Sequence, residues 1–93
     1  MIIGVLNLTL IIPSSNSLKD KRQVVKSIKD RLRNKFNISV AEVGEKEKWQ
    51  AAHLAVVIVN DDKKYLETVL NEVIHFVEGE RNVYVEDIAT EIL

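Results

Sequence analysis

Residues 17–36 have the pattern of an amphipathic helix, and this segment constrains the fold more than any other part of the sequence. Ser17 is a favourable N-cap residue, and Asp20 follows three residues later, which is close to a capping box. Apolar residues then recur at helical spacing, so that they share one stripe of the helix surface. The stripe comprises Leu18, Val25, Ile28, Leu32 and Phe36. We therefore expect a helix that packs on one face.

A second row of the same helix is basic, and its members are three or four residues apart. This row, termed the basic ridge, comprises Lys19, Arg22, Lys26, Lys29 and Arg33. Arg31 and Lys35 fall on the opposite flank. Lys21 falls near the apolar stripe, and we expect its stem to be buried at the rim of the core while its ammonium group reaches solvent.

The charge of the chain is divided unevenly along the sequence. Residues 17–35 contain eight Lys or Arg and two Asp, a formal charge of +6, whereas the 93-residue total is −1. The remainder therefore carries −7. Such asymmetry suggests an anionic partner, and structured RNA is the partner that we expect for the basic ridge. A solvated helix face that is neutralised by the acidic remainder explains the same pattern, because exposed charge pairs contribute little.

Length and composition indicate one globular domain spanning residues 1–93, with 46% hydrophobic and 29% charged residues. The sequence has no cysteine, which excludes disulfides, a thiol nucleophile and cysteine-ligated metals. The apolar segment 1–12 lacks a basic n-region and a small-residue cleavage site, so we interpret it as a strand rather than a signal peptide. A cytoplasmic location is expected.

The remaining segments alternate between strand and helix patterns. Asp62 is placed to cap a second helix, and Gly79 to end it. The expected elements are strands at 2–12, 38–43, 49–59 and 83–93, and helices at 17–36 and 62–78. This βαββαβ order predicts an α+β, ferredoxin-like fold. Its four-stranded antiparallel sheet should have the order 4-1-3-2, with both helices on one face.

Alternate residues of the two central strands should point away from the helices and form an apolar surface. The set comprises Val5, Ile11, Trp49, Ala51, Ala55, Val57 and Val59. Such a patch needs a partner, and burial against a second copy in a symmetric homodimer is the simplest solution. A register error of one residue would instead exchange the two faces of each strand.

No cofactor, metal site or catalytic group is expected. His53 and His75 have no carboxylates at ligand spacing, and the three glycines form no phosphate-binding loop. The sheet also lacks the aromatic set and the signature of an RNA-recognition motif. Trp49 is therefore interpreted as a packing or interface residue rather than a base-stacking platform.

The run SLKDKRQVVKSIKDRLRNKFNISVAEV, the Trp49-Gln50 pair and the final EIL resemble the YlxP-like family of small bacterial proteins, a domain of unknown function. The resemblance covers essentially the whole chain and implies a ferredoxin-like fold in a cytosolic bacterial protein. Genes of this family often lie among those for translation and ribosome maturation, which implies an RNA partner. No activity is established for it. The motif residues of unsettled role are Ser17, Leu18, Lys19, Asp20, Lys21 and Arg22.

Three functions follow as alternatives. The first is a non-catalytic accessory factor that binds structured RNA or ribosomal particles through the basic ridge. The second is a homodimeric protein-interaction module whose charges only maintain solubility. The third is a ligand-binding or enzymatic module with a site between subunits. A membrane partner is not expected, because the apolar stripe of the first helix should be covered by the sheet.

Overall fold

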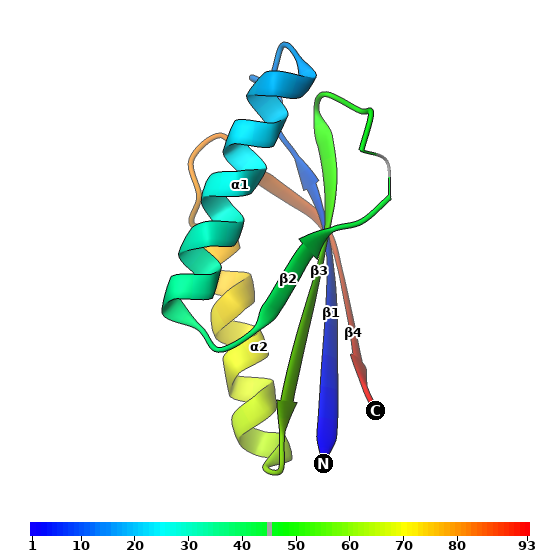
Figure 1. The fold of residues 1–93 in the computed structure, drawn as a ribbon, viewed down its shortest axis with the longest axis vertical. Coiled ribbons are helices and arrows are strands. Elements are labelled where there is room, and N and C mark those ends of the chain that lie inside the picture. Colours follow the sequence, from blue (N-terminus) through cyan, green and yellow to red (C-terminus); the bar gives the residue numbers. More distant parts are fainter. Residues whose placement is uncertain (45) are drawn as a thin grey trace.

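The computed structural model describes residues 1–44 and 46–93, so Glu45, within the predicted polar connection, lies outside the described residues. The chain has the predicted βαββαβ order (Figure 1). The elements are β1 (Ile2–Ile11), α1 (Leu18–Lys35), β2 (Ser39–Glu42), β3 (Ala51–Asn60), α2 (Lys63–Glu78) and β4 (Tyr84–Ile92). The observed bounds differ from the predicted ones by one or two residues at most ends, where caps and turns replace regular pairing.

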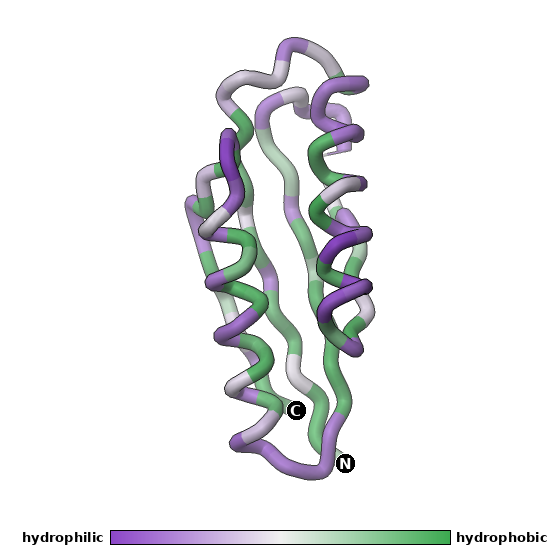
Figure 2. The backbone as a smooth tube through the Cα atoms, turned by 90° about the vertical axis from the view of Figure 1, so that its left-hand side faces the viewer, coloured by the Kyte–Doolittle hydropathy of each residue, from purple (hydrophilic) through white to green (hydrophobic). Residues whose placement is uncertain are grey.

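The four strands form an antiparallel sheet with the order β2-β3-β1-β4, which confirms the predicted topology. β1 and β3 are central and pair along their whole length, from Ile2 opposite Asn60 to Ile11 opposite Ala51. Both helices cover the same face of this sheet, as Figures 1 and 2 show. The molecule therefore has two layers, and the other sheet face is left without helices.

The core lies between the helices and the sheet. On β1 and β3 the buried and less buried residues alternate, and the buried set faces the helices. It includes Leu6, Leu8, Leu10, Leu54, Val56 and Ile58. The predicted assignment of the two strand faces is therefore correct, and the alternative register does not occur.

Gly4 lies where side chains of α2 pack directly against β1. A Cβ atom at this position would be 2.5 Å from Cδ2 of Leu66 and 3.1 Å from Cδ1 of Leu70. Only glycine leaves room for both leucines at this point, so the missing side chain sets the distance between the helix and the strand.

Gly79 follows the last residue of α2, as predicted, but it does not use the left-handed conformation that glycine often provides at a helix end. Its φ is −80°, and its N–H donates to the carbonyl of His75 at 3.1 Å. The left-handed residue of this connection is Asn82, with a φ of 64°. The chain thus makes a further turn after α2 before it reverses into β4.

Candidate functional site

The first turn of α1 is fixed by side chains on either side of its start. Oγ of Ser17 accepts the N–H of Asp20 at 3.1 Å, and Oδ2 of Asp20 accepts the N–H of Asn16 at 3.0 Å. These bonds confirm the predicted cap and satisfy backbone donors that a helix leaves unpaired. Because the helix is anchored here and its apolar stripe is buried against the sheet, the orientation of its polar faces is fixed as well.

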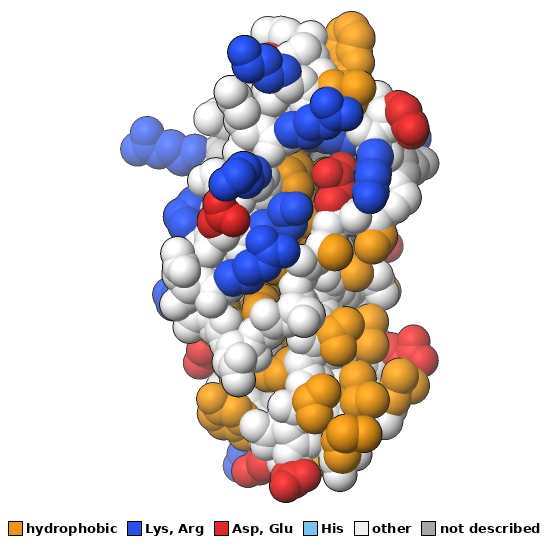
Figure 3. All heavy atoms as spheres, in the orientation of Figure 1, with side chains coloured by type: hydrophobic (Ala, Val, Ile, Leu, Met, Phe, Trp, Pro, Cys, Tyr) orange, Lys and Arg blue, Asp and Glu red, His pale blue; other side chains and the backbone are white. Residues whose placement is uncertain are grey.

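The basic ridge lies on the outer side of α1. Lys19, Arg22, Lys26 and Arg33 are exposed, and Lys29 is half-buried. Figure 3 shows Lys and Arg side chains gathered over the upper part of the molecule, where α1 lies, and hydrophobic side chains at the lower right, over the sheet. Within residues 1–44 and 46–93, no ion pair or side-chain hydrogen bond engages Lys19, Arg22 or Lys29.

Asp30 is the acidic residue that lies within the basic ridge. Nζ of Lys26 donates to its Oδ2 at 2.7 Å, and Nη1 of Arg33 is 3.7 Å from its Oδ1. The hydrogen bond from Lys26 is the main reason that the pKa of Asp30 is lowered from its ordinary value, with the charges of Lys26, Arg33 and Lys29 adding to the effect. Five cations and one carboxylate leave the surface strongly positive.

The cations on the opposite flank of α1 are engaged by α2 and the chain that follows it. Arg31 forms a bidentate ion pair with Glu80, and this pair raises the pKa of the Arg31 guanidinium. Its guanidinium carbon also lies 5.6 Å from the ring centre of Phe76, and Nζ of Lys35 lies 5.4 Å from the same centre. These two cations therefore hold the helices together. On the ridge, Nη2 of Arg33 donates to the carbonyl of Val40 on β2 at 2.7 Å, whereas Lys19, Arg22 and Lys26 are exposed.

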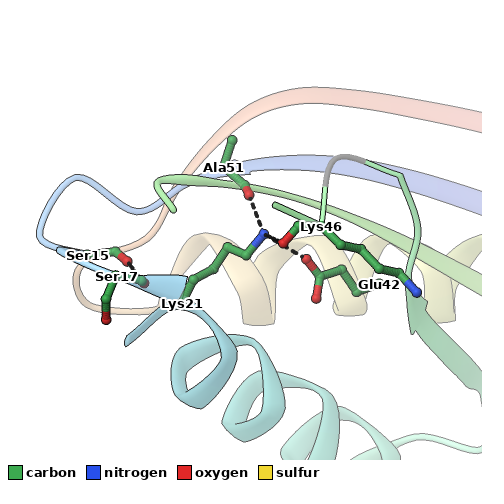
Figure 4. Close-up of polar contacts among 6 residues, drawn as sticks. All are labelled: Ser15, Ser17, Lys21, Glu42, Lys46 and Ala51. Atoms are coloured by element: carbon green, nitrogen blue, oxygen red, sulfur yellow. Dashed lines mark hydrogen bonds and ion pairs between the residues drawn. The ribbon is translucent and has the colours of Figure 1, made fainter. Parts of the chain in front are cut away.

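Lys21 corrects the sequence-based expectation, because its ammonium group does not reach solvent. The side chain is completely buried, and Nζ lies 3.1 Å from Oε2 of Glu42. The same nitrogen donates to the carbonyls of Lys46 at 2.9 Å and Ala51 at 3.2 Å (Figure 4). The contact with Glu42 is an ion pair of imperfect alignment, since Oε2 has no well-directed hydrogen bond among the described residues. The buried carboxylate and carbonyl oxygens replace the water that the ammonium group loses, so the group stays inside the protein rather than at the rim of the core.

The connection between β2 and β3 is tied to the start of α1 by Lys21 and also by Gln50. Nε2 of Gln50 donates to the carbonyls of Pro13 at 3.0 Å and Ser15 at 3.2 Å, and its own carbonyl accepts the N–H of Ile12 at 2.8 Å. These bonds join segments that are distant in the sequence into one end of the molecule. The basic ridge begins at this same end.

Trp49 lies on this anchored connection, and its side chain is not part of the core. The residue is 55% exposed and lines a shallow hollow of about 540 Å³ together with Ile11, Lys48 and Ala51. The interpretation of Trp49 as a packing or interface residue, rather than a base-stacking platform, stays a prediction.

The remaining residues of the predicted dimer surface share the sheet face opposite the helices. Val59 is exposed, and the other members are half-buried: Val5, Ile11, Ala51, Ala55 and Val57. On this face Nδ1 of His53 lies 3.2 Å from Oγ1 of Thr9. His75 is exposed on α2, as predicted. In the described parts of the chain, no three His, Asp or Glu side chains are grouped as a metal site would require.

Comparison with known proteins places the chain in a family. Residues 3–90 match the family described as "Protein of unknown function (DUF503)". The chain belongs to this family. It is also 35% identical over 77 residues to "Uncharacterized protein YlxP" of Bacillus subtilis (strain 168), and the matched segment is 83% of this chain and 84% of that protein. The resemblance to YlxP-like proteins is thus confirmed, and the family's description assigns no function.

Solved structures resemble the chain in fold alone. "De novo designed protein Foldit4" is 16% identical with a TM-score of 0.58, over 98% of this chain and 97% of that one. LarC2, "the C-terminal domain of a cyclometallase involved in the synthesis of the NPN cofactor of lactate racemase", is 9% identical with a TM-score of 0.50. That match covers 100% of the present chain and 55% of the LarC2 chain. Both similarities agree with a ferredoxin-like fold, and neither indicates a function for this chain.

Neither helix of the described residues is both long and apolar enough to span a membrane.

Glu42 is a site residue that the sequence analysis did not predict. A signal for it exists, because strand alternation places Glu42 on the same face as the buried Val40, directed towards the helices. A carboxylate at such a position needs a buried cation, and Lys21 on the apolar side of α1 is suited to that role.

Proposed function

We propose that the protein is a non-catalytic accessory factor that binds structured RNA, or ribosomal particles, through the basic ridge of α1. The observation that carries this proposal is a difference among the α1 cations, because some of them are engaged in contacts within the chain and others are exposed. Arg31 and Lys35 are occupied by contacts to α2, Lys21 is buried, and Arg33 donates to the carbonyl of Val40 on β2. In contrast, Lys19, Arg22 and Lys29 make no ion pair or side-chain hydrogen bond among the described residues, and Lys26 pairs only with Asp30 of the same helix. A helix that needed its charges only for internal pairing would not leave this row outside.

The ridge has a length suited to a phosphate backbone. From Lys19 to Arg33 the helix rises about 21 Å, at 1.5 Å per residue, so its cations can meet several successive phosphates. Lysines would act as point charges, and Arg22 could bridge two phosphate oxygens. Such contacts fix the position of an RNA without reading its sequence, which is how double-stranded RNA is mostly recognised.

The anchored start of α1 supports the proposal further. Ser17 caps the helix, and Lys21 and Gln50 hold the β2–β3 connection beside it, so the ridge is presented by a fixed scaffold. Binding to a preformed surface loses less conformational entropy than binding to a flexible one. The motif residues of α1 thereby fall into two roles. Ser17, Asp20 and Lys21 build the scaffold, and Lys19 and Arg22 bind the partner.

The proposal is tested with fluorescence anisotropy of a structured RNA and two matched variants. In the ridge variant, Lys19, Arg22 and Lys29 are changed to Gln, because these side chains make no ion pair or hydrogen bond among the described residues. In the control variant, the exposed Lys63, Lys64 and Arg81, which lie off the ridge, are changed to Gln. Both variants lose the same charge, so a general charge effect would weaken them equally.

We expect the ridge variant to bind RNA at least about tenfold more weakly than the control at low salt, since three phosphate contacts are lost. Equal affinities of the two variants, or no binding by the wild-type protein, would remove the basis of the proposal.

A protein-interaction role is the second candidate. The apolar sheet face opposite the helices favours it, and this face is independent of the basic ridge. The two roles are compatible, because one uses the outer side of α1 and the other uses the opposite side of the molecule.

A further inference from the structure

The sheet face away from the helices, termed the open face, holds four of the eight large apolar side chains that are exposed among the described residues. Pairing places Val43 beside His53, Val59 beside Ile3, Tyr84 beside Ile11, and Leu93 also beside Ile3, all on this face. Val43, Val59, Tyr84 and Leu93 are 40%, 56%, 65% and 64% exposed. An apolar surface of this kind marks a contact with another protein rather than with water.

The charges of the open face exclude an RNA partner there. The strands are described in full, and none of their positions that face away from the helices carries Lys or Arg. Asp87 and Glu91 of β4 do face outwards, because they pair with Thr9 and Val5 of the open face. The one charged residue of β2, Glu42, points to the opposite side. The face is thus uncharged on the two central strands, where Asn7, Thr9 and His53 lie between apolar rows, acidic along the β4 edge and uncharged along the β2 edge.

The size of the open face suits a dimer. β1 and β3 have ten residues each. Ten residues extend about 33 Å, and four strands about 4.8 Å apart give a width of roughly 15 Å. The plane of the face is then about 500 Å² per copy and about 1,000 Å² for two copies, which is near the lower bound for a specific interface. Side chains that project from this plane increase the area that the contact buries.

We propose that two copies of the chain form a homodimer through their open faces, around a two-fold axis that runs parallel to the strands. The helices then form the two outer layers, and each copy keeps its basic ridge exposed. The sheets pack face to face, as in other two-sheet structures, with the side chains of both open faces between them.

The orientation of the axis follows from charge and from the register of the sheet. An axis along the strands sets β4 of one copy across from β2 of the other, so Asp87 and Glu91 meet the uncharged edge that carries Ser39 and Val43. An axis across the strands would set β4 against β4 and bring carboxylates together, which is unfavourable in a desolvated interface. The first arrangement avoids this cost.

The same orientation also brings residues of similar polarity together across the interface, because each row of residues paired across the sheet meets the same row of the second copy. Ser39, Val57, Val5 and Glu91 form one row across the sheet, as the pairings of the four strands show. An axis along the strands places each row over the same row of the second copy. The apolar row of Ile3, Val59 and Leu93 then covers itself, and the row of His53 and Thr9 meets polar groups.

The dimer is tested by light scattering and sedimentation of the full chain with two matched lysine substitutions. Val59→Lys puts a charge on the open face, in the row that covers itself. Ile88→Lys changes another exposed apolar strand residue, 41% exposed, which pairs with Leu8 and so lies on the opposite side of the sheet. Thermal unfolding and circular dichroism establish that both variants are folded before their masses are compared.

At about 100 μM we expect wild type and Ile88→Lys to have twice the 10.6 kDa mass of the chain, and Val59→Lys to dissociate with a Kd at least about tenfold higher. A wild-type protein that is monomeric at this concentration overturns the proposal. Equal dissociation of the two variants overturns the assignment to the open face.

The axis is tested by cross-linking, since the sequence has no cysteine of its own. Packed sheets lie about 10 Å apart, beyond the reach of a disulfide, so a short bis-maleimide is used. A mixture of Ser39→Cys and Glu91→Cys chains should cross-link efficiently, because these positions end the same row. Preferential cross-linking of Ser39→Cys with Val43→Cys would indicate the axis across the strands, and cross-linking of neither pair would overturn the face-to-face dimer. RNA affinity is measured separately, so the two proposals fail independently.

Discussion

Nζ of Lys21 lies 3.1 Å from Oε2 of Glu42, and the lysine side chain is inaccessible to solvent. This pair joins α1 to β2, while the same ammonium group donates to the carbonyl of Lys46, within the β2–β3 connection, and to that of Ala51, at the start of β3. One buried charge therefore fixes the helix that carries the basic ridge against the sheet. Lys21 of the SLKDKR motif therefore has a structural role, whereas its neighbours Lys19 and Arg22 remain exposed.

Changing Lys21 to Met should destabilise the fold strongly. The substitution leaves the Glu42 carboxylate without its cation and two carbonyls without a donor, which costs about 3–5 kcal/mol when one partner of a buried pair is removed. Urea unfolding followed by circular dichroism measures the loss. The exposed Lys19→Met variant is the control and should change the free energy of unfolding by less than about 0.5 kcal/mol.

The double variant Lys21→Met with Glu42→Leu should recover most of this loss, because apolar residues often replace a buried ion pair with little cost. A deficit of about 1–3 kcal/mol should persist, since the carbonyls of Lys46 and Ala51 still lack a donor. If the double variant is no more stable than Lys21→Met alone, the ion pair is not what makes the single change costly.

Two glycine substitutions should have opposite effects on stability. Gly4→Ala places a methyl group within 2.5 Å of Leu66 and should destabilise the protein by about 1–3 kcal/mol through overpacking. Gly79→Ala meets no heavy atom closer than 3.5 Å and keeps a right-handed φ, so it should be neutral or stabilise by up to about 1 kcal/mol. Thermal unfolding of the two variants side by side checks this. A destabilised Gly79→Ala protein would contradict the right-handed helix end.

The lowered pKa of Asp30 predicts a small loss of stability in acid. Because the folded-state pKa lies below the ordinary value of 3.8, the Lys26 contact stabilises the fold above pH 3.8 and is lost as the pH falls through the folded-state pKa. An NMR titration of the Asp30 carboxyl should show a midpoint below 3.8 in wild type and a higher one in Lys26→Gln. Unchanged midpoints would show that the hydrogen bond does not form in solution.

Asp30→Asn should strengthen RNA binding, because it removes the negative charge that lies among the ridge cations and frees Lys26. We expect affinity to rise by a factor of about 2–5 at low salt, the scale of one added phosphate contact, and the gain to shrink as salt increases. Glu72→Gln, on the exposed side of α2, removes the same charge elsewhere and should have a smaller effect. Equal gains from the two changes would indicate that only net charge matters.

The elements of the fold could be predicted because each is encoded locally. The apolar stripe of α1, the Ser17 cap and the alternation of β1 and β3 determine element type and buried face with little influence from the rest of the chain. The strand order then follows from the βαββαβ sequence and the apolar character of the two central strands. These features depend on residues close together in the sequence.

The features that escaped prediction depend on contacts between distant segments. Lys21 and Glu42 are 21 positions apart, and the pattern around each residue does not name the other as its partner. Their pairing becomes visible only when helix and strand are packed, although both occupy inward-facing positions. Likewise, the sequence does not show that Arg31 is taken up by Glu80 while Arg22 is left outside. That difference determines which cations of α1 stay exposed, and it is a property of the tertiary structure.

The salt dependence of RNA affinity tests the proposed role of the basic ridge most directly. Each phosphate contact contributes about 0.7–0.9 to the slope of log affinity against log salt, so changing Lys19, Arg22 and Lys29 together to Gln should lower the slope by about 2–3. The variant with Lys63, Lys64 and Arg81 changed to Gln should keep the wild-type slope. If the ridge variant keeps that slope as well, RNA does not lie along α1, and the basic ridge serves another partner or only solvation.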